Sequence, residues 1–304
     1  MGELNILQSV DNVKTDPTWN CFLPSLSHPD QGHNTFLRYN RTPINLIDMY
    51  KDQTCFFIGR GNSLSKYIED EKIKNKLLHK CIFKYCVNTS PDVLGFDCNL
   101  WSCCDRVSKF SKNILLSPTI TKIIPMNRLI EITSETAIKD TKKTLAYKDP
   151  SNIKYASQCP NMVGSDTFLM ADLAVKNVPF YQAFLESPYI LYGKYPGSKS
   201  VFLFALKTML LLGFKRIVLL GVDFDMDINR PYYNETLKKY NKYHVDHNNK
   251  LYNNIIPDIE KIYKNINKKY DNVEILTGNP IKTMPFIKNV DINNILDEEI
   301  KHLT

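Results

Sequence analysis

The run Arg216–Val222, in which almost every residue is apolar, limits the fold more than any other stretch of the chain. Such a run fits a strand that is covered on both faces of a sheet, because a half-exposed strand would alternate apolar and polar residues. The preceding segment, 200–212, has apolar residues at helical spacing, and Gly213 follows it as a typical helix-ending residue. A helix that leads directly into a doubly covered strand is typical of a parallel α/β sheet.

The same alternation of strands and helices recurs along the rest of the chain. We expect further strands at 51–58, 81–87, 100–104, 114–116, 122–124 and 272–276, and helical segments at 65–80, 166–175 and 253–268. The predicted fold class is therefore α/β, with a Rossmann-like, mostly parallel sheet, helices on both faces and a C-terminal lid segment.

The chain divides by composition into an extension and one domain. Residues 1–48 are polar and rich in turn residues, and we interpret them as an N-terminal extension. Residues 49–304 are predicted to form a single nucleotide-binding catalytic domain, with a lid at about 225–252. The stretch 127–165 shows little apolar periodicity and is interpreted as a surface insertion.

Charge and cysteine content limit the partners and the compartment. The net charge of +7 favours anionic partners such as nucleotides, phosphorylated sugars, nucleic acid or acidic membrane surfaces, although biased codon usage also produces Lys-rich surfaces. The eight cysteines lack zinc-finger spacing and fit a reduced protein. No apolar run approaches the ~20 residues of a membrane span, and no secretory signal is visible. We expect a cytoplasmic location, which for a viral protein means the host cytoplasm.

The first predicted strand ends at the turn Gly59-Arg60-Gly61-Asn62-Ser63, just before a helical segment. Backbone N–H groups at such a turn, together with small polar side chains, form a typical seat for a phosphate group. A Gly-x-Gly turn alone is common in proteins. The hypothesis of a phosphate or nucleotide site therefore depends on what the other strands bring to the same edge of the sheet.

Polar residues also follow three other predicted strands, namely Asn88, Asp105 and Asp223. In open parallel sheets ligands bind outside the carboxyl ends of the strands, so these residues are expected near the Gly59–Ser63 turn. Each of them also has an ordinary interpretation, as a turn residue or a helix cap. Together they predict a ligand pocket at this edge.

Two polar clusters after residue 222 have both a chemical and an ordinary interpretation. Asp223, Asp225 and Asp227 alternate after a buried strand and could hold Mg²⁺ or Mn²⁺ on a nucleotide diphosphate, or could form a solvated acidic turn. A second cluster belongs to a surface loop of biased composition or to a catalytic lid in which phenols donate to phosphate and a histidine acts as general base. Its members are Tyr232, Tyr233, Tyr240, Tyr243, His244 and His247.

Three segments carry a resemblance to a known family. They are 58–64, with its apolar strand and Gly-x-Gly turn; 198–224, with a polar turn, a helix and Gly-Phe-Lys-Arg-Ile-Val-Leu-Leu-Gly-Val-Asp-Phe; and 243–248, followed by a helix, the strand 273–276 and Asn279-Pro280. In this order they resemble the bacterial sialyltransferases of glycosyltransferase family forty-two. They also resemble the wider group of motility accessory factor and archaeal pterin pyrophosphokinase proteins, including phage and bacterial members.

The resemblance implies a role for each matching position. It implies that the nucleotide phosphate and ribose are held by Gly59, Gly61, Asn62 and Ser63, and that Asn88 touches the nucleotide. It also implies that Ser198 and Ser200 help to bind the base and sugar. In the lid, it implies that Tyr232 and Tyr233 neutralise the leaving phosphate and that His247 deprotonates the acceptor hydroxyl, with His244 as its substitute. Two positions depart from the family. Asn62 stands where a proline is usual, and Arg60 adds a cation beside the phosphate.

These features predict an inverting glycosyltransferase that uses a CMP- or UDP-linked sugar, with Mg²⁺ or Mn²⁺ as an additional cofactor if the aspartates hold it. The acceptor would be a surface glycan or a hydroxymethylated DNA base. One alternative is an ATP- and Mg²⁺-dependent pyrophosphokinase of the pterin type, with Asp223, Asp225 and Asp227 as metal ligands. Another is a non-catalytic nucleotide-binding module. The sequence leaves the oligomeric state open, and a homo-oligomer is compatible with it.

Overall fold

The computed structural model describes residues 46–105, 110–125, 200–227 and 242–303. It also describes the short pieces 36–38, 43–44, 130–132, 153–155 and 167–170 and the single residues 181, 184, 185, 229, 232 and 233. They belong to two compact units. Unit 1 draws on Met1–Ile47, Cys103–Ala174 and Tyr189–Gly197, and unit 2 on Asp48–Ser102, Val175–Pro188 and Ser198–Thr304.

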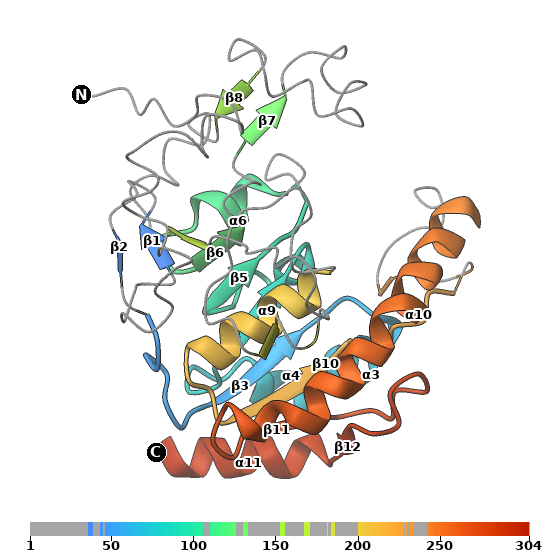
Figure 1. Cartoon of the computed structure of the whole chain (residues 1–304). Coiled ribbons are helices and arrows are strands. Elements are labelled where there is room, and N and C mark those ends of the chain that lie inside the picture. The colour runs from blue at the N-terminus through green and yellow to red at the C-terminus, as the bar shows by residue number, and fades with distance from the viewer. Residues whose placement is uncertain are drawn as a thin grey trace. The chain divides into compact units, whose positions relative to one another are not determined.

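Unit 2 is built on a parallel sheet (Figure 1). Its described strands are β3 (Thr54–Ile58), β4 (Lys84–Val87), β5 (Leu100–Ser102), β10 (Arg216–Leu220), β11 (Glu274–Thr277) and β12 (Lys288–Asn289). They lie in the order β12-β11-β10-β3-β4-β5, and every neighbouring pair is parallel. The predicted α/β class with a mostly parallel sheet is confirmed.

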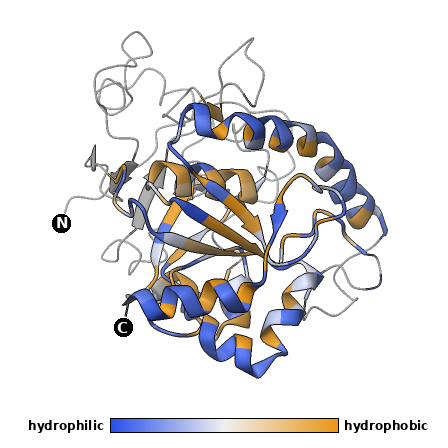
Figure 2. Ribbon diagram, turned by 90° about the horizontal axis from the view of Figure 1, so that it is seen from below, coloured by the Kyte–Doolittle hydropathy of each residue, from blue (hydrophilic) through white to orange (hydrophobic). Residues whose placement is uncertain are grey.

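Helices cover both faces of this sheet, as predicted. They are α3 (Ser65–Ile68), α4 (Glu71–Leu77), α5 (Ser90–Val93), α9 (Val201–Leu211), α10 (Lys242–Asn265) and α11 (Ile292–Leu303), with 3-10 turns η1 (Asn62–Leu64) and η9 (Ile266–Lys268). Figure 2 shows α9 and α10 over one face and α4 and α11 over the other, with hydrophobic residues turned toward the sheet. None of the helices in the described part of the chain is long and apolar enough to cross a membrane.

The core of unit 2 lies around β3 and β10, the two central strands. Ile217 pairs in register with Cys55 and Leu219 with Phe57, and all four side chains are buried. Helix α9 is buried over almost its whole length, which explains why its sequence is apolar on every side. Each fully buried Leu, Ile or Phe side chain contributes roughly 1.5–3 kcal/mol to stability. The carboxyl ends of β3 and β10 are thus held on a rigid base.

Unit 1 contains β1 (Phe36–Arg38), β2 (Pro43–Ile44), β6 (Thr121–Pro125) and β9 (Thr167–Met170), together with the antiparallel pair β7 (Ile130–Ile132) and β8 (Ile153–Tyr155). The strand expected at 122–124 is confirmed as β6. Two expectations were wrong. Residues 167–170 form a strand rather than a helix, because they pair with β6 and β1. Residues 114–116 lie in helix α6 (Lys112–Leu116), which the Ser111 hydroxyl caps.

The segment predicted as a lid is helical in its second half. Helix α10 begins at Lys242 rather than at 253, because Val245 extends the buried stripe that Ile255, Ile259 and Ile262 continue at helical spacing. Residues 234–241, in the middle of the predicted lid, lie outside the described residues. Most of the predicted extension 1–48 and insertion 127–165 lies outside them as well.

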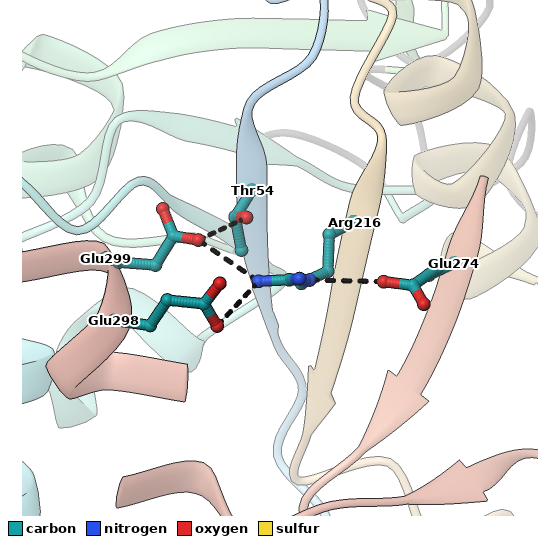
Figure 3. A network of polar contacts seen from close by, with 5 residues as sticks. All are labelled: Thr54, Arg216, Glu274, Glu298 and Glu299. Carbon is teal, nitrogen blue, oxygen red and sulfur yellow. Dashed lines mark hydrogen bonds and ion pairs between the residues drawn. The ribbon is translucent and has the colours of Figure 1, made fainter. Parts of the chain in front are cut away.

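A cluster of charges ties α11 to the amino end of the sheet (Figure 3). The Arg216 guanidinium, at the start of β10, lies 3.2 Å from Glu274, 3.1 Å from Glu298 and 3.5 Å from Glu299. The Thr54 hydroxyl, at the start of β3, donates to Glu299 at 2.6 Å. These contacts join the central strands β3 and β10 to strand β11 and to the C-terminal helix α11.

Candidate functional site

The strand order of unit 2 places a ligand crevice between β3 and β10. From β3 the chain continues to β4 and β5 on one side, whereas from β10 it continues to β11 and β12 on the other side. In open α/β sheets the crevice outside such a reversal, at the carboxyl ends of the strands, is the usual ligand site. The Gly59–Ser63 turn follows β3, and Gly221–Asp223 follows β10. Both predicted segments therefore lie at the reversal.

The two segments contact each other through their backbones. The Gly59 N–H donates to the Leu220 carbonyl at 2.8 Å, and the Gly61 N–H donates to the Gly221 carbonyl at 2.7 Å. A Cβ atom on Gly59 would overlap the Gly221 carbonyl oxygen, and Gly221 itself has a φ of +65°. Glycine is required at these two positions because the chains approach closely and one of them is left-handed.

Asp223 lies against the Gly59–Ser63 turn, where we expected a phosphate. Its Oδ2 accepts the Ser63 N–H at 3.0 Å, and a Cβ atom on Gly61 would be 2.5 Å from the same oxygen. The prediction of free N–H groups is thus wrong for Gly59, Gly61 and Ser63, which all donate to groups of the protein. The start of a helix favours an anion, and here the chain provides its own carboxylate.

Arg60 fastens the segment that carries Tyr232 and Tyr233 to the turn. Its Nη2 donates to the Tyr233 carbonyl at 2.7 Å, and the Tyr233 N–H donates to the Arg60 carbonyl at 2.9 Å. Its Nη1 donates to the Thr89 hydroxyl, just after β4. Burial raises the pKa of Asp92, and the nearby Arg60 charge partly offsets that increase. Arg60 thus binds protein groups from two other segments, which its sequence position did not reveal.

Two buried polar atoms at this edge have no hydrogen-bond partner within the described part of the chain. They are Asn88 Oδ1, directly after β4, and the Tyr67 hydroxyl in α3. The backbone of Asn88 is fixed, because its N–H donates to the Ser102 carbonyl at 2.9 Å and its carbonyl accepts the Trp101 indole N–H at 2.7 Å. A buried polar group without a partner is costly and indicates a place where a ligand or water completes the bonding.

The charge of Asp223 contributes to a raised pKa in two tyrosines, Tyr67 and Tyr252. Burial, and after it the Asp223 charge, raises the pKa of Tyr67 well above its usual value. Burial also raises the pKa of Tyr252, with a further increase from Asp223 and a partial offset from a hydrogen bond with Tyr232. Both phenols therefore keep their protons at neutral pH and can donate hydrogen bonds near the carboxylate.

The loop after Asp223 is held in a strained conformation against α10. Phe224 has a φ of +49°, which is unusual for a large side chain, and its ring packs edge-on between Phe202 and Tyr252 at 5.1 and 5.4 Å. The Asn249 side chain accepts the Met226 N–H at 2.8 Å and donates to the Met226 carbonyl at 3.0 Å. Strained residues that are fixed so firmly often mark functional sites.

The three aspartates that were predicted to share a metal ion do not converge. Asp223 faces the Gly59–Ser63 turn, whereas Asp225 and Asp227 are exposed. Asp227 accepts the N–H of Asn229 at 2.8 Å, as in an ordinary Asx turn. Among the residues that the structure describes, no three His, Cys, Asp or Glu side chains are placed to hold a metal ion. Buried Phe224 and Met226 separate the carboxylates and direct them apart.

Other predicted positions have different places. Ser200 caps α9, because its hydroxyl accepts the Leu203 N–H at 3.2 Å, and Ser198 lies outside the described residues. Asp105 belongs to unit 1, where it is exposed and its carbonyl accepts a bond from Cys103 Sγ at 3.5 Å. The ligand-binding roles of Asp105, Ser198 and Ser200 remain predictions.

Both candidate base histidines lie on an exposed face of α10. His244 and His247 are exposed, and the His247 ring stacks on Tyr243 at 6.2 Å. At ~100° per residue, His247 points about 140° around the helix from Tyr252, which faces the site. The structure therefore does not bring His247 to the buried side of α10. Its role as a base remains a prediction.

Further residues support the site from the segment after β11. Asn279 donates from Nδ2 to the Ser63 carbonyl at 3.3 Å and accepts from Lys66 Nζ at 3.2 Å. The Thr283 hydroxyl donates to the Asp223 carbonyl at 3.4 Å. Thr283, Asn249 and Tyr67 were not among the predicted site residues. Tyr67 had only one sequence signal, which is its position in the first helix after the Gly-x-Gly turn.

Comparisons with known proteins give a distant likeness in fold. No family model and no curated protein matches the chain. Among solved structures, the sialyltransferase CstII from Campylobacter jejuni, in complex with the substrate analogue cytidine-5'-monophosphate, matches with a TM-score of 0.39 and 13% identity. The match covers 80% of this chain and 86% of that chain. It is a distant resemblance in fold.

Proposed function

We propose that this chain is an inverting glycosyltransferase that uses a nucleotide-activated sugar. The observation that supports this proposal best is a contact between two sequence segments that resemble the sialyltransferase family. Ser63 and Asp223, which are 160 residues apart in sequence, are joined by a hydrogen bond at the strand reversal of the sheet. Two of the three segments that carry the resemblance therefore meet at the edge where α/β sheets usually bind ligands, which supports the proposal.

The residues around this crevice suit a nucleotide. Asn88 Oδ1, which has no partner among the described residues, could accept a hydrogen bond from a hydroxyl or amino group of the nucleotide. Arg60 supplies a cation beside the turn, and its two bonds with Tyr233 hold the Tyr232–Tyr233 pair close to it. This position supports the proposed role of the two tyrosines in neutralising the leaving phosphate.

The proposed reaction is a single displacement. A base, for which His247 is the first candidate and His244 the second, takes the proton of the acceptor hydroxyl. The acceptor oxygen attacks the anomeric carbon, the bond from that carbon to the phosphate oxygen breaks, and the nucleotide leaves with the electron pair. Because His247 is exposed on α10 and does not face the crevice, the base role requires a rearrangement of α10 that brings the imidazole within hydrogen-bond reach of the acceptor hydroxyl.

The pterin-type pyrophosphokinase has no supporting observation, since its carboxylates, Asp223, Asp225 and Asp227, do not converge. Thermal shifts with CMP, UDP, GDP and ATP, each with and without Mn²⁺, separate the candidates. We expect a shift with CMP or UDP. A shift with ATP and metal alone would favour the kinase.

Transfer is then tested with CMP- and UDP-linked sugars, with a glycan and hydroxymethylated DNA as separate acceptors, and mass spectrometry as the readout. We expect one acceptor to gain the mass of the sugar. His247→Ala should abolish transfer and retain nucleotide binding, with Asp246→Asn on the same helix as control. Binding without transfer to any acceptor would leave a nucleotide-binding module as the better description.

A further inference from the structure

Apart from the Arg60 guanidinium, which donates to Tyr233 and Thr89, the groups around the Gly59–Ser63 turn are mostly hydrogen-bond acceptors. A phosphate is itself an acceptor, so it finds few donors there. The N–H groups of Gly59, Gly61 and Ser63 already donate to the protein. Asp223 places a carboxylate on the turn, and Asn88 presents a buried carbonyl oxygen without a partner among the described residues. An anionic phosphate placed here would meet a like charge and could give no proton to either acceptor.

A sugar ring has the complementary chemistry. Its hydroxyl groups donate hydrogen bonds, and two neighbouring hydroxyls suit a carboxylate, as the acidic residue that binds ribose in dinucleotide-binding folds shows. Tyr67 and Tyr252 stay protonated beside Asp223 and can donate to ring oxygens. Tyr67 is only 4% exposed, and its hydroxyl has no partner in the described part of the chain. The site therefore combines two acceptors with buried phenol donors, which is suited to a polyhydroxylated ring.

We propose that the crevice binds its ligand with a hydroxyl-bearing sugar ring against Asp223 and Asn88, and that the phosphate lies off the backbone N–H groups of the Gly-x-Gly turn, on the side where the Arg60 guanidinium meets Tyr233. This inference rests on the proposed function, because it orients the nucleotide sugar of that reaction. It assigns to Asp223 the selection of a diol, and it reverses the usual orientation at a turn of this kind. The ring is the ribose of the nucleotide or the sugar to be transferred.

The test compares ligands that differ only in hydroxyl groups. Titration calorimetry measures the Kd of CMP, UMP, GMP and AMP against their 2′,3′-dideoxy counterparts. A parallel arm compares UDP-glucose with its counterparts that lack the 2- or the 3-hydroxyl of the glucose ring. We expect loss of the hydroxyls in one arm to weaken binding roughly 10- to 100-fold, the usual effect of losing a hydrogen bond to a charged group. A loss in the first arm identifies the ribose, and a loss in the second identifies the transferred sugar.

Asp223→Asn distinguishes the carboxylate from the rest of the site. We expect this variant to bind the hydroxyl-bearing ligand no more than about threefold more tightly than the ligand that lacks the hydroxyls. The Ser63 N–H should still donate to the side chain at position 223, because Asn retains one side-chain oxygen. Asp246→Asn, an exposed carboxylate on α10, is the matched control and should keep the full preference.

Three outcomes would contradict the orientation. Equal binding of the hydroxyl-bearing and hydroxyl-lacking ligands in the wild type would overturn it without any variant, and leaves the proposed function standing. A preference that survives in Asp223→Asn would remove the role of the carboxylate. Failure of all these nucleotides to bind would overturn the proposed function as well.

Discussion

At the amino ends of the central strands of unit 2, polar side chains pair with one another, whereas at the carboxyl ends two buried polar side chains have no partner among the described residues. Arg216 contacts three glutamates, and Thr54 donates to one of the three. At the other end, the buried oxygens of Asn88 and Tyr67 have no partner within the described residues. The first arrangement completes itself and holds the fold together. The second is left incomplete, which is typical of a place that binds another molecule.

The largest difference should come from glycine positions at the carboxyl end. In Gly59→Ala the new Cβ overlaps the Gly221 carbonyl, so the backbones must separate and nucleotide binding is lost. We expect the free energy of unfolding to fall by about 3 kcal/mol, the upper part of the usual range for overpacking. Chemical denaturation measures this change.

Gly95→Ala is the matched control for that substitution. Unlike Gly59, Gly95 has a positive φ, +61°, and nothing lies within 4 Å of its Cβ position. We expect it to lose about 1 kcal/mol, the cost of a left-handed residue with a side chain, and to bind nucleotide normally. Equal losses in the two variants would show that the close approach at Gly59 is unimportant.

At the amino end, Arg216→Met should lower stability and leave the ligand site intact. The substitution removes the partner of three carboxylates at once, of which Glu299 is the most buried. After allowance for solvent screening of the more exposed pairs, we expect a loss of about 2 kcal/mol. Nucleotide affinity should stay within twofold of the wild type, as measured by titration calorimetry. A tenfold loss of affinity would break the distinction between the two ends.

Two hydroxyl deletions compare the ends directly. Thr54→Val removes a hydroxyl that donates to Glu299, and we expect a loss of about 1 kcal/mol. Tyr67→Phe removes a buried hydroxyl without a partner in the described structure, so stability should stay constant or rise by about 1 kcal/mol. Ligand binding should weaken only in Tyr67→Phe. If Tyr67→Phe proves as destabilising as Thr54→Val, the hydroxyl has a structural partner.

The smallest effect is expected at the loop after β10. Asn249→Ala removes two bonds to the Met226 backbone, and we expect a loss of about 1 kcal/mol because water replaces part of them. Asn248→Ala, next to it, removes only an exposed bond to the His244 carbonyl within the same helix. It should change stability by less than ~0.5 kcal/mol. Thermal unfolding of the two variants measures the difference.

The sequence predicted the sheet well because its signals are local. The apolar run of β10, the turn after β3 and the helix before Gly213 each lie within a few residues, and all are present in the structure. The strand at 167–170 was predicted as a helix, because its pairing with β1 and β6 depends on residues far away in sequence. A local sequence pattern predicts a helix or strand correctly only where long-range strand pairing does not override it.

The candidate site was predicted in its location but not in its bonding. Gly59, Ser63 and Asp223 meet at the expected edge. That Asp223 would take the anion position on the turn could not be read from the sequence, since the contact spans 160 residues. For the same reason the sequence did not show that Arg60 contacts Tyr233, 173 residues away.

Hydrogen–deuterium exchange with and without CMP and UDP tests the central claim, that the carboxyl end of the unit 2 sheet is the ligand site and the amino end is not. We predict that the better-binding nucleotide slows exchange in peptides that cover 59–64, 88–89 and 221–227. Peptides that cover α11, at the other end, should exchange at an unchanged rate. Slower exchange in α11 without any change at the Gly59–Ser63 turn would contradict the account.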